Sequence, residues 1–234
     1  MENGRQDPRN GGYFLEQLRR EGRAERDERA RLYISPRRVL WESEGENCSV
    51  VGSAALLQDK PGQISLHSDA CCTLKNSGAS ASLLLDFGQE LHGGIELSVQ
   101  KVTGAQRAKL RIRFGESATE AMSELGGATN ATNDHARRDL EIYVHALSMD
   151  AVGETGFRFV RIDLLSENVA VSLKAAKAVL VYLDVPYLGS FHCSDALLER
   201  IWDVAAYTVH LNMQQYIWDG IKRDRWVWSG DAYQ

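Results

Sequence analysis

Short apolar runs, separated by Gly, Asn, Asp and Ser, follow one another between residue 33 and about residue 187. Two of these runs, 110–114 and 157–162, alternate apolar and polar side chains with the two-residue period of a half-buried strand. The pattern predicts strands at 38–41, 64–67, 81–87, 94–99, 109–114, 139–144, 157–164 and 176–184. Because many short strands with turn residues between them are typical of sandwiches, we expect a mainly β fold, an antiparallel jelly-roll-like β-sandwich.

The pattern changes on both sides of this region. Residues 1–32 are dense in charge, which predicts a solvated arm or a surface helix with ion pairs four residues apart. After Pro186, Ser194 is a suitable N-cap for a helix that begins at Asp195 and runs to about residue 216, where Gly220 follows as a breaker. The predicted organisation is an N-terminal arm at 1–32, a sandwich domain at 33–186 and the start of a helical domain at 187–234.

The segment 218–231 mixes tryptophans with charged side chains: Trp218, Asp219, Lys222, Arg223, Asp224, Arg225, Trp226, Trp228 and Asp231. Tryptophan is costly to expose and an unpaired carboxylate is costly to bury, so the mixture favours the wall of a pocket. Aromatic faces beside carboxylate and guanidinium groups are suited to binding sugars. The alternative is a set of ion pairs at a domain boundary, with Asp224 held between Arg223 and Arg225.

The run 219–231, D-G-I-K-R-D-R-W-V-W-S-G-D, resembles the signature of the α-L-rhamnosidases, family 78 of the glycoside hydrolases. That signature reads roughly D-x-x-x-R-(E or D)-R-x-x-W-x-G-D, and its defining places are filled here by Asp219, Arg223, Arg225, Trp228, Gly230 and Asp231. Weaker similarities lie at 85–88, 113–116, 156–160, 189–195 and 206–210, so the resemblance covers most of the chain from about residue 33. We refer to 219–231 as the signature.

The resemblance implies a fold and a chemistry. It implies a β-sandwich followed by the first helix of an (α/α)6 barrel, which this chain begins but does not complete. It also implies inverting hydrolysis of terminal α-L-rhamnose by two carboxyl groups, one acting as acid and one as base. Asp224 matches the place of the general acid, where the family commonly has Glu. The matching base lies further along the family's chain, so we expect the 234-residue chain alone to be inactive.

Four further residues receive roles from the same match. Asp219 and Asp231 match positions that hydrogen-bond the hydroxyl groups of rhamnose. Arg223 matches one that orients the acid or the sugar, and Trp228 matches the aromatic wall. Because a general acid must carry its proton, a pairing of Asp224 with an arginine would oppose its role. We therefore expect Arg223 and Arg225 to point at Asp219 and Asp231.

Composition bears on which partners, cofactors and cellular location we expect for this chain. The net charge of −5, without a basic stripe beyond the N-terminus, gives no support to nucleic-acid binding. No apolar run approaches the roughly 20 residues of a membrane span, and the N-terminus lacks the apolar core of a signal peptide, which favours the cytoplasm. Four cysteines in a chain of this length form no disulfide framework, and the histidines are scattered singly. We expect no cofactor. The expected partners are a rhamnose-containing glycoside and the remainder of the catalytic domain.

Two alternatives remain open at this stage. The long acid-containing loop at 116–137 is expected to be functional or disordered; calcium is one possible ligand, but the spacing of its acids matches no calcium loop. The sandwich can also be a non-catalytic carbohydrate-binding module or a purely structural domain that stabilises a catalytic partner. Few candidate exposed aromatic residues occur between 33 and 187, which favours the structural interpretation of that domain.

Overall fold

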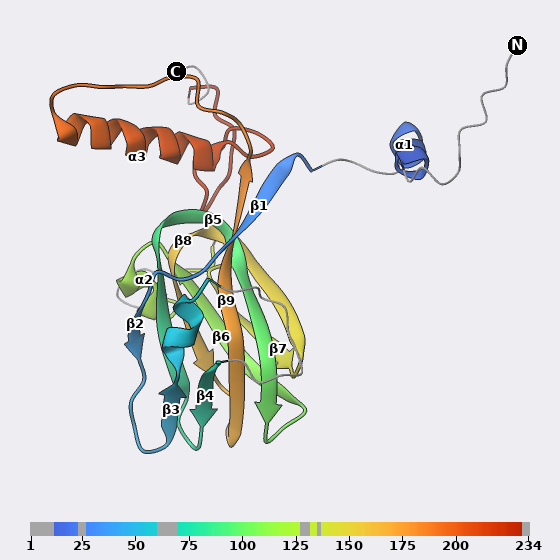
Figure 1. Ribbon diagram of the computed structural model, residues 1–234, viewed down its shortest axis with the longest axis vertical. Helices are drawn as coiled ribbons and strands as arrows, with labels where there is room; N and C mark the ends of the chain where they lie inside the picture. The colour runs from blue at the N-terminus through green and yellow to red at the C-terminus, as the bar shows by residue number, and fades with distance from the viewer. Residues whose placement is uncertain (1–11, 23–26, 60–69, 127–131, 135–136, 231–234) are drawn as a thin grey trace, which may run out of the picture.

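The computed structural model describes residues 12–22, 27–59, 70–126, 132–134 and 137–230. Their elements are α1 Gly12–Arg20, β1 Arg29–Ile34, β2 Arg38–Glu42, β3 Cys48–Val51, the 3₁₀ helix η1 Ser53–Leu57, β4 Cys72–Asn76, β5 Ala81–Thr103, β6 Arg107–Gly115, α2 Ala118–Met122, β7 Asp139–His145, β8 Ser148–Leu164, β9 Val169–Leu183 and α3 Ala196–Asn212. The strands form one body, and α3 lies across one end of it (Figure 1). The mainly β, antiparallel class predicted from the sequence is therefore confirmed.

The sheet is organised around the long strand β5. Its strand order is β3-β4-β9-β5-β8-β6-β7, with β1 paired to β9 and β2 paired to β5, and every pairing is antiparallel. The first part of β5 pairs with β2, and its later part pairs with β9, whereas β8 follows it along both parts. The sheet thereby curves around a single core, as Figure 1 shows.

Side chains from the central strands fill this core. Phe157 of β8 contacts Phe87 and Phe114 edge-on, with ring centroids 5.9 and 4.9 Å apart. Aliphatic side chains surround these rings, among them Leu83, Leu85, Leu91, Ile95, Leu97, Leu110, Ile112, Val160, Ile162, Val171 and Leu173. Burial of these apolar surfaces supplies most of the driving force for folding.

The predicted strands of the interior are confirmed, with two changes of length. The strands predicted at 81–87 and 94–99 are parts of one strand, β5, which continues through a shift of register between Asp86 and Leu91. Strands β8 and β9 begin earlier than predicted, at Ser148 and Val169. The strand predicted at 64–67 lies outside the described residues.

Strands β1, β3 and β4 were not predicted. They lie at or next to the margins of the sheet, where polar and charged side chains interrupt the apolar pattern. Strand β1 begins at Arg29, within the stretch assigned to the charged arm. The division of the chain into domains stays a prediction.

The C-terminal helix is shorter than predicted. Its N-cap is Asp195 and not Ser194, because the Asp195 carboxylate accepts a hydrogen bond of 2.8 Å from the backbone N–H of Leu197. It ends at Asn212, before Gly220 is reached. The chain turns there because the side-chain amide of Gln214 donates to the carbonyl oxygens of Leu211 and Val181, at 2.9 and 3.1 Å.

Two of the upstream runs that resemble the family, 85–88 and 156–160, contact each other through hydrogen bonds in the structure. Asp86 from the run 85–88 is fully buried, and Arg158 from the run 156–160 donates two hydrogen bonds to it, at 2.8 and 3.1 Å. Arg38 of β2 and the backbone N–H of Gly88 also donate to Asp86, each at 2.8 Å. The carboxylate therefore joins β2, β5 and β8 where the register of β5 shifts.

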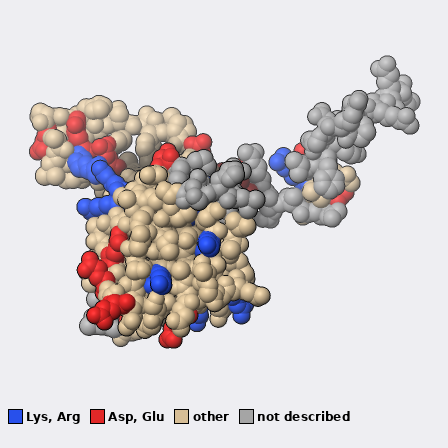
Figure 2. Space-filling view, turned by 60° about the horizontal axis from the view of Figure 1, so that its bottom comes forward, with Lys and Arg blue, Asp and Glu red and all other residues tan. Residues whose placement is uncertain are grey.

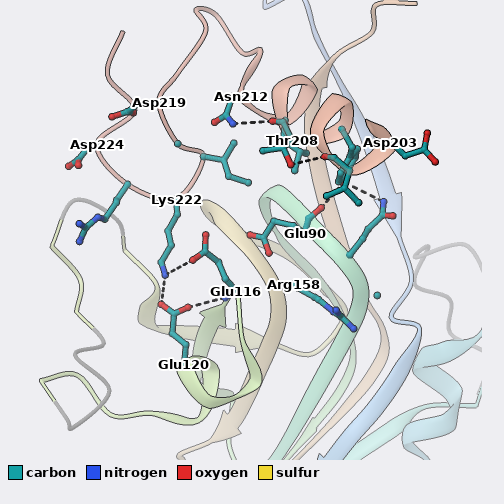
Figure 3. Close-up of a pocket in the computed structure, with 18 of the residues that line it drawn as sticks. Glu90, Glu116, Glu120, Arg158, Asp203, Thr208, Asn212, Asp219, Lys222 and Asp224 are labelled. Carbon is teal, nitrogen blue, oxygen red and sulfur yellow. Dashed lines mark hydrogen bonds and ion pairs between the residues drawn. The ribbon is translucent and has the colours of Figure 1, made fainter. Parts of the chain in front are cut away.

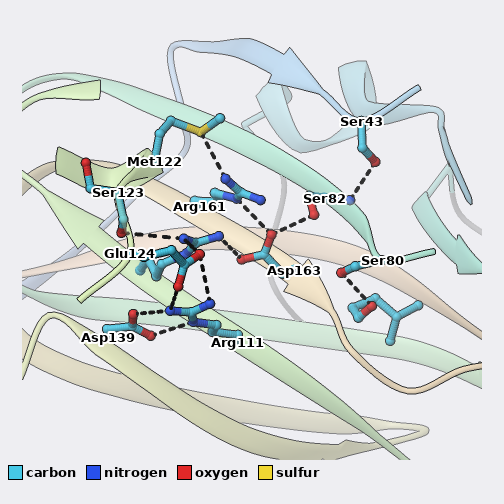
Figure 4. A network of polar contacts seen from close by, with 12 residues as sticks. Ser43, Ser80, Ser82, Arg111, Met122, Ser123, Glu124, Asp139, Arg161 and Asp163 are labelled. Carbon is cyan, nitrogen blue, oxygen red and sulfur yellow. Dashed lines mark hydrogen bonds and ion pairs between the residues drawn. The ribbon is translucent and has the colours of Figure 1, made fainter. Parts of the chain in front are cut away.

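A second polar network fixes the beginning of the acidic loop (Figure 4). Buried Arg113 binds Asp163 and Glu124, each at 2.8 Å, and Arg111 binds Glu124 and Asp139. Arg138, also buried, donates to the carbonyl oxygens of Glu120 and Ser123. These contacts of Arg138 and Arg113 attach helix α2 and the residues that follow it to the sheet.

No helix in the described ranges is long and apolar enough to cross a membrane.

On the face shown in Figure 2, the basic and acidic side chains form small groups with uncharged surface between them. The helix α1 carries one ion pair of the expected kind, between Glu16 and Arg20 at 3.4 Å.

The buried carboxylate gives the first testable prediction. Asp86→Asn should lower the free energy of unfolding by about 3 kcal/mol at neutral pH, because two arginines lose the anion they share. Desolvation alone would raise the pKa of Asp86, but hydrogen bonds from Arg158, Gly88 and Arg38 outweigh it and lower the pKa from 3.8 to about 2. A lowered pKa stabilises the fold above about pH 4, and this contribution is lost as the pH falls toward 2.

Urea unfolding at several pH values measures both effects. Between pH 4 and pH 2 the free energy of unfolding should fall in both proteins. The fall should be about 2 kcal/mol smaller in the Asp86→Asn variant than in the unmodified chain. Asp59→Asn, at a side chain that is 98% exposed, is the matched control and should change neither quantity. An equally steep loss in the Asp86 variant would show that this carboxylate does not carry the effect.

Candidate functional site

The signature follows α3, and α3 is held to the sheet through its C-terminal half. The hydroxyl group of Tyr207 donates to the backbone oxygen of Glu90 at 2.6 Å. One ring nitrogen of His210 lies 2.6 Å from the backbone oxygen of Leu183, and the other lies 3.0 Å from the hydroxyl group of Tyr187. These contacts fix the point from which the signature loop starts.

A cleft lies between α3, the signature loop and the adjoining end of the sheet (Figure 3). Its volume is about 1040 Å³. The sheet and the acidic loop contribute Gly88, Gln89, Glu90, Glu116, Glu120, Thr132, Asp134 and Arg158; helix α3 contributes Arg200, Asp203, Val204, Tyr207, Thr208, Leu211 and Asn212; and the signature contributes Asp219, Gly220, Ile221, Lys222, Arg223 and Asp224. The sequence prediction that this segment forms a pocket wall agrees with this arrangement.

The signature loop is docked on the sheet by Ile221. This side chain is 7% exposed and belongs to the main hydrophobic core. It lies over Gly156 of β8, where an added Cβ would be 2.8 Å from Cγ1 of Ile221 and 3.2 Å from Cβ of Lys222. The absence of a side chain at position 156 therefore allows the loop to approach the strand.

Lys222 connects the loop to the acidic loop. Its ammonium group lies 3.0 Å from Oε2 of Glu116 and 2.5 Å from Oε1 of Glu120, as Figure 3 shows. Desolvation acts to lower the pKa of Lys222, but the hydrogen bonds to Glu120 and Glu116 outweigh it and raise the pKa above its usual value. Lys222 thus stays charged at neutral pH and bridges two carboxylates.

Arg225 does not contact Asp219 among the described residues. It donates to the backbone oxygen of Glu154, lies 3.5 Å from the Glu154 carboxylate, and stacks over the ring of Trp218. Glu154 thus offers Arg225 an anion on the strand against which the loop is docked. The expectation that Arg223 and Arg225 point at Asp219 and Asp231 stays a prediction where it concerns Asp231, which lies outside the described residues.

Asp219 is used within the loop itself. Its carboxylate accepts hydrogen bonds from the backbone N–H of Trp226 at 2.9 Å and from the indole N–H of Trp228 at 3.0 Å. Desolvation acts to raise the pKa of Asp219, but these hydrogen bonds from Trp226 and Trp228 lower it overall. The two indoles stack with centroids 5.8 Å apart, and Trp228 is not among the residues that line the cleft.

Asp224 lies on the wall of the cleft and is exposed. Its backbone has φ +66°, and that of Arg225 has φ +52°, so two successive residues with side chains lie in the left-handed region. Such conformations cost about 1–2 kcal/mol and persist where the surrounding contacts determine them. The structure thus brings Asp219, Arg223 and Asp224 to one cleft, whereas Asp231 lies outside the described residues.

Glu90 is a cleft residue that the sequence did not indicate. It follows the buried part of β5, and its Oε1 atom is buried without a hydrogen-bond partner. Burial raises the pKa of Glu90 to about 8, and the negative charges of Glu116 and Glu120 act in the same direction. A neutral carboxyl group therefore faces the cleft at physiological pH. No local sequence signal distinguishes it, because its neighbours come from distant parts of the chain.

The three glutamates of the long loop are paired with cations of the protein. Glu124 binds arginines, and Glu116 and Glu120 bind Lys222. No group of three His, Cys, Asp or Glu side chains suited to a metal ion occurs in the part of the chain that the structure describes.

Comparison with known proteins supports the resemblance. The family described as the bacterial alpha-L-rhamnosidase 6 hairpin glycosidase domain matches residues 186–234. An alpha-L-rhamnosidase of Formosa agariphila is 27% identical over 165 residues, which are 67% of this chain and 16% of that protein.

Two solved structures share the fold. A rhamnosidase from Klebsiella oxytoca with rhamnose bound has a TM-score of 0.60 at 17% identity, over 94% of this chain and 42% of that one. The family 78 rhamnosidase of Bacillus sp. GL1 has a TM-score of 0.58 at 20% identity, over 76% of this chain and 18% of that one. The chain thus spans less than half of each relative. These findings support the resemblance of this chain to the α-L-rhamnosidases, most directly over residues 186–234.

The buried carboxyl group of Glu90 gives a prediction for stability. The folded chain keeps this proton up to about pH 8, whereas an unfolded chain releases it near pH 4.5. The free energy of unfolding should therefore fall between these pH values, and Glu90→Gln, which cannot ionise, should avoid that loss. The stability gained by the variant should grow with pH by on the order of 3 kcal/mol.

Urea unfolding from pH 4.5 to 8.5 measures this difference. Glu167→Gln, at an exposed glutamate, is the control and should follow the unmodified chain. A constant difference between the Glu90 variant and the unmodified chain would show that Glu90 is ionised throughout.

The backbone of Asp224 gives a second prediction. Asp224→Gly and Asp224→Ala both remove the carboxylate, but only glycine adopts a positive φ without strain. The glycine variant should therefore be about 1 kcal/mol more stable than the alanine variant. The same pair of substitutions at Asp203, within α3, should give the opposite order, because glycine weakens a helix. Urea unfolding followed by tryptophan fluorescence compares the four variants, and the same order at both positions would contradict a left-handed Asp224.

Proposed function

We propose that this chain contributes the sandwich and the first catalytic segment of a glycoside hydrolase that removes terminal α-L-rhamnose by an inverting mechanism. Asp224 is the general acid. The observation that carries the proposal is that Asp219, Arg223 and Asp224 line one cleft in a segment within the matched residues 186–234. The rhamnosidase relatives support the substrate class.

In the proposed mechanism, Asp224 has the step in which the leaving oxygen is protonated. In inverting hydrolysis a carboxylic acid protonates the leaving oxygen, while a carboxylate on the opposite face of the sugar activates water. The two groups lie roughly 6.5–9.5 Å apart to admit that water. Asp224 is exposed and lines the cleft, so a leaving group that enters the cleft can approach its carboxyl group. Its side chain is one methylene shorter than the glutamate common in the family, so the leaving oxygen must approach the loop more closely.

The sugar is held by the other signature residues. In this proposal Asp219 and Asp231 bind hydroxyl groups of rhamnose, and Arg223 orients the sugar or the acid. Trp228 forms an aromatic wall for a part of the substrate that extends beyond the described cleft, which Trp228 does not line. Trp228 is half exposed and stacked on Trp226, which leaves a flat apolar face beside the loop. An indole whose N–H is already bound to Asp219 presents that face in a fixed orientation.

The 234-residue chain alone is proposed to be inactive, because the resembled family takes its catalytic base from further along the chain. The alternative is a non-catalytic carbohydrate-binding or structural sandwich. The polar contacts that attach the signature loop to the sandwich favour a domain that supports catalysis over an independent sugar-binding module. A cytoplasmic location remains a proposal from the sequence.

Activity of a longer gene product tests the proposal. The gene continued past Gln234 should encode a protein that hydrolyses an aryl α-L-rhamnoside, and Asp224→Asn should lower kcat by about 10²-fold or more, as loss of a general acid does. The loss should be smaller for aryl leaving groups of low pKa, because they need less protonation. Asp59→Asn is the control and should keep full activity.

Three results would contradict parts of the proposal. Turnover by the 234-residue chain itself would overturn the claim that it is inactive alone. Full activity of the Asp224 variant would remove that residue from the mechanism. A retained anomeric configuration in the product, measured by proton NMR, would exclude inversion.

A further inference from the structure

We propose that the sandwich domain positions the predicted acid: Glu116 and Glu120 act on Asp224 through Lys222, and Gly156 acts on it through Ile221. These four residues are positioning residues and do not touch the substrate in this proposal. The inference rests on the proposed function of Asp224, but its structural part, the fixing of the loop by the sandwich, can be tested without turnover.

Attachments lie on both sides of Asp224 in the chain. Before it, Ile221 is packed in the core and Lys222 bridges two glutamates. After it, Arg225 is bound to Glu154 of β8. Only Arg223 and Asp224 lie between these points, so the chain has little freedom there. This explains how the left-handed conformation of Asp224 is maintained against its cost.

The glutamates that hold Lys222 are themselves fixed. The hydroxyl group of Ser117 caps α2 by accepting a hydrogen bond from the backbone N–H of Glu120 at 3.1 Å. The Glu120 carboxylate also accepts from the backbone N–H of Glu116 at 2.9 Å. From beneath, the buried guanidinium group of Arg138 donates to the backbone oxygen of Glu120 at 2.9 Å. Lys222 is therefore bound to a rigid turn and not to freely moving surface side chains.

The ion pairs of Lys222 differ from an ordinary surface pair. The side chains of Lys222 and Glu120 are only 24% and 17% exposed, and the lysine has two anionic partners. Partial burial reduces screening by water and salt, and charge-assisted hydrogen bonds are stronger than neutral ones. Loss of Lys222 would also leave Glu116 and Glu120 without the cation that they share. The loop should then separate from the sheet.

Gly156 acts on the same loop by a different contact. Its hypothetical Cβ would lie 2.8 and 3.1 Å from two side-chain carbons of Ile221, closer than unstrained carbons approach. Alanine at this position must therefore displace the loop at Ile221, two residues before Arg223. No charge changes in this variant, so it separates the position of the loop from the electrostatics of the glutamates.

Hydrogen exchange followed by mass spectrometry tests the structural part in the 234-residue chain. Lys222→Met and Gly156→Ala should each increase exchange in peptides covering 219–226 by about tenfold, while protection of β5 and β9 stays unchanged. Lys109→Met is the matched control: it removes an exposed lysine–glutamate pair with Glu141 and should not alter the loop. Unchanged exchange at 219–226 in both variants would overturn the inference.

Activity in the longer gene product tests the link to catalysis. Lys222→Met should lower kcat by about tenfold or more with little change in KM, because a mispositioned acid weakens the chemical step more than binding. Exchanging the charges, with Lys222→Glu and Glu120→Lys together, should restore part of kcat. Loosened exchange with unchanged kcat would overturn the positioning role. If the longer protein has no activity, the proposed function fails while the exchange result still decides whether the sandwich fixes the loop.

Discussion

The close approach of Ile221 to Gly156 is the contact on which the arrangement of the cleft depends. It inserts a side chain of the signature into the same core that holds the sheet together, so the loop is not a separate appendage. Once Ile221 is seated, Lys222 meets Glu116 and Glu120, and Arg225 meets Glu154. A hydrophobic contact thus sets the place of the loop, and the ion pairs around it determine its orientation. Burial of a large aliphatic side chain contributes about 1.5–3 kcal/mol to stability.

Several anions of the sheet and of the acidic loop are each shared by two arginines. Asp86 is shared by Arg38 and Arg158, Asp163 by Arg113 and Arg161, and Glu124 by Arg111 and Arg113. Glu90 differs from these anions, because burial raises its pKa to about 8 and its carboxyl group keeps its proton. The structure therefore gives the glutamates of the acidic loop at 116–137 a role that the sequence did not indicate. Its glutamates are structural anions for arginine and lysine, which accounts for their number without a metal ion.

The sequence predicted the interior of the fold better than its margins and its cleft. Strand β6, which lies between β8 and β7, carries an uninterrupted alternation because one of its sides faces the core. Strands β1 and β3 lie where water reaches their side chains, so their pattern is broken by Arg, Ser and Cys. In the cleft, Asp219, Arg223 and Asp224 were found by resemblance to a motif, since the motif is local. The role of Lys222 was missed because its two partners are 106 and 102 residues away, and pairing over that distance leaves no periodic signal. Glu90 was missed because its burial depends on how the strands and loops pack. The anion that Arg225 meets was also missed, because Glu154 is on β8 rather than in the signature.

Among the described residues, the sheet and the acidic loop hold the signature loop in place. Exposed apolar side chains remain on α3 and on the loop, among them Leu197, Ile201 and Val209 of α3 and the stacked Trp226 and Trp228. A surface of this kind is typical of an interface that another part of a protein covers. In the proposed enzyme, the further helices of the six-hairpin domain would cover it and would at the same time remove water from Asp224. In this proposal the sandwich supplies the position of the predicted acid, and the covering helices exclude water from the cleft.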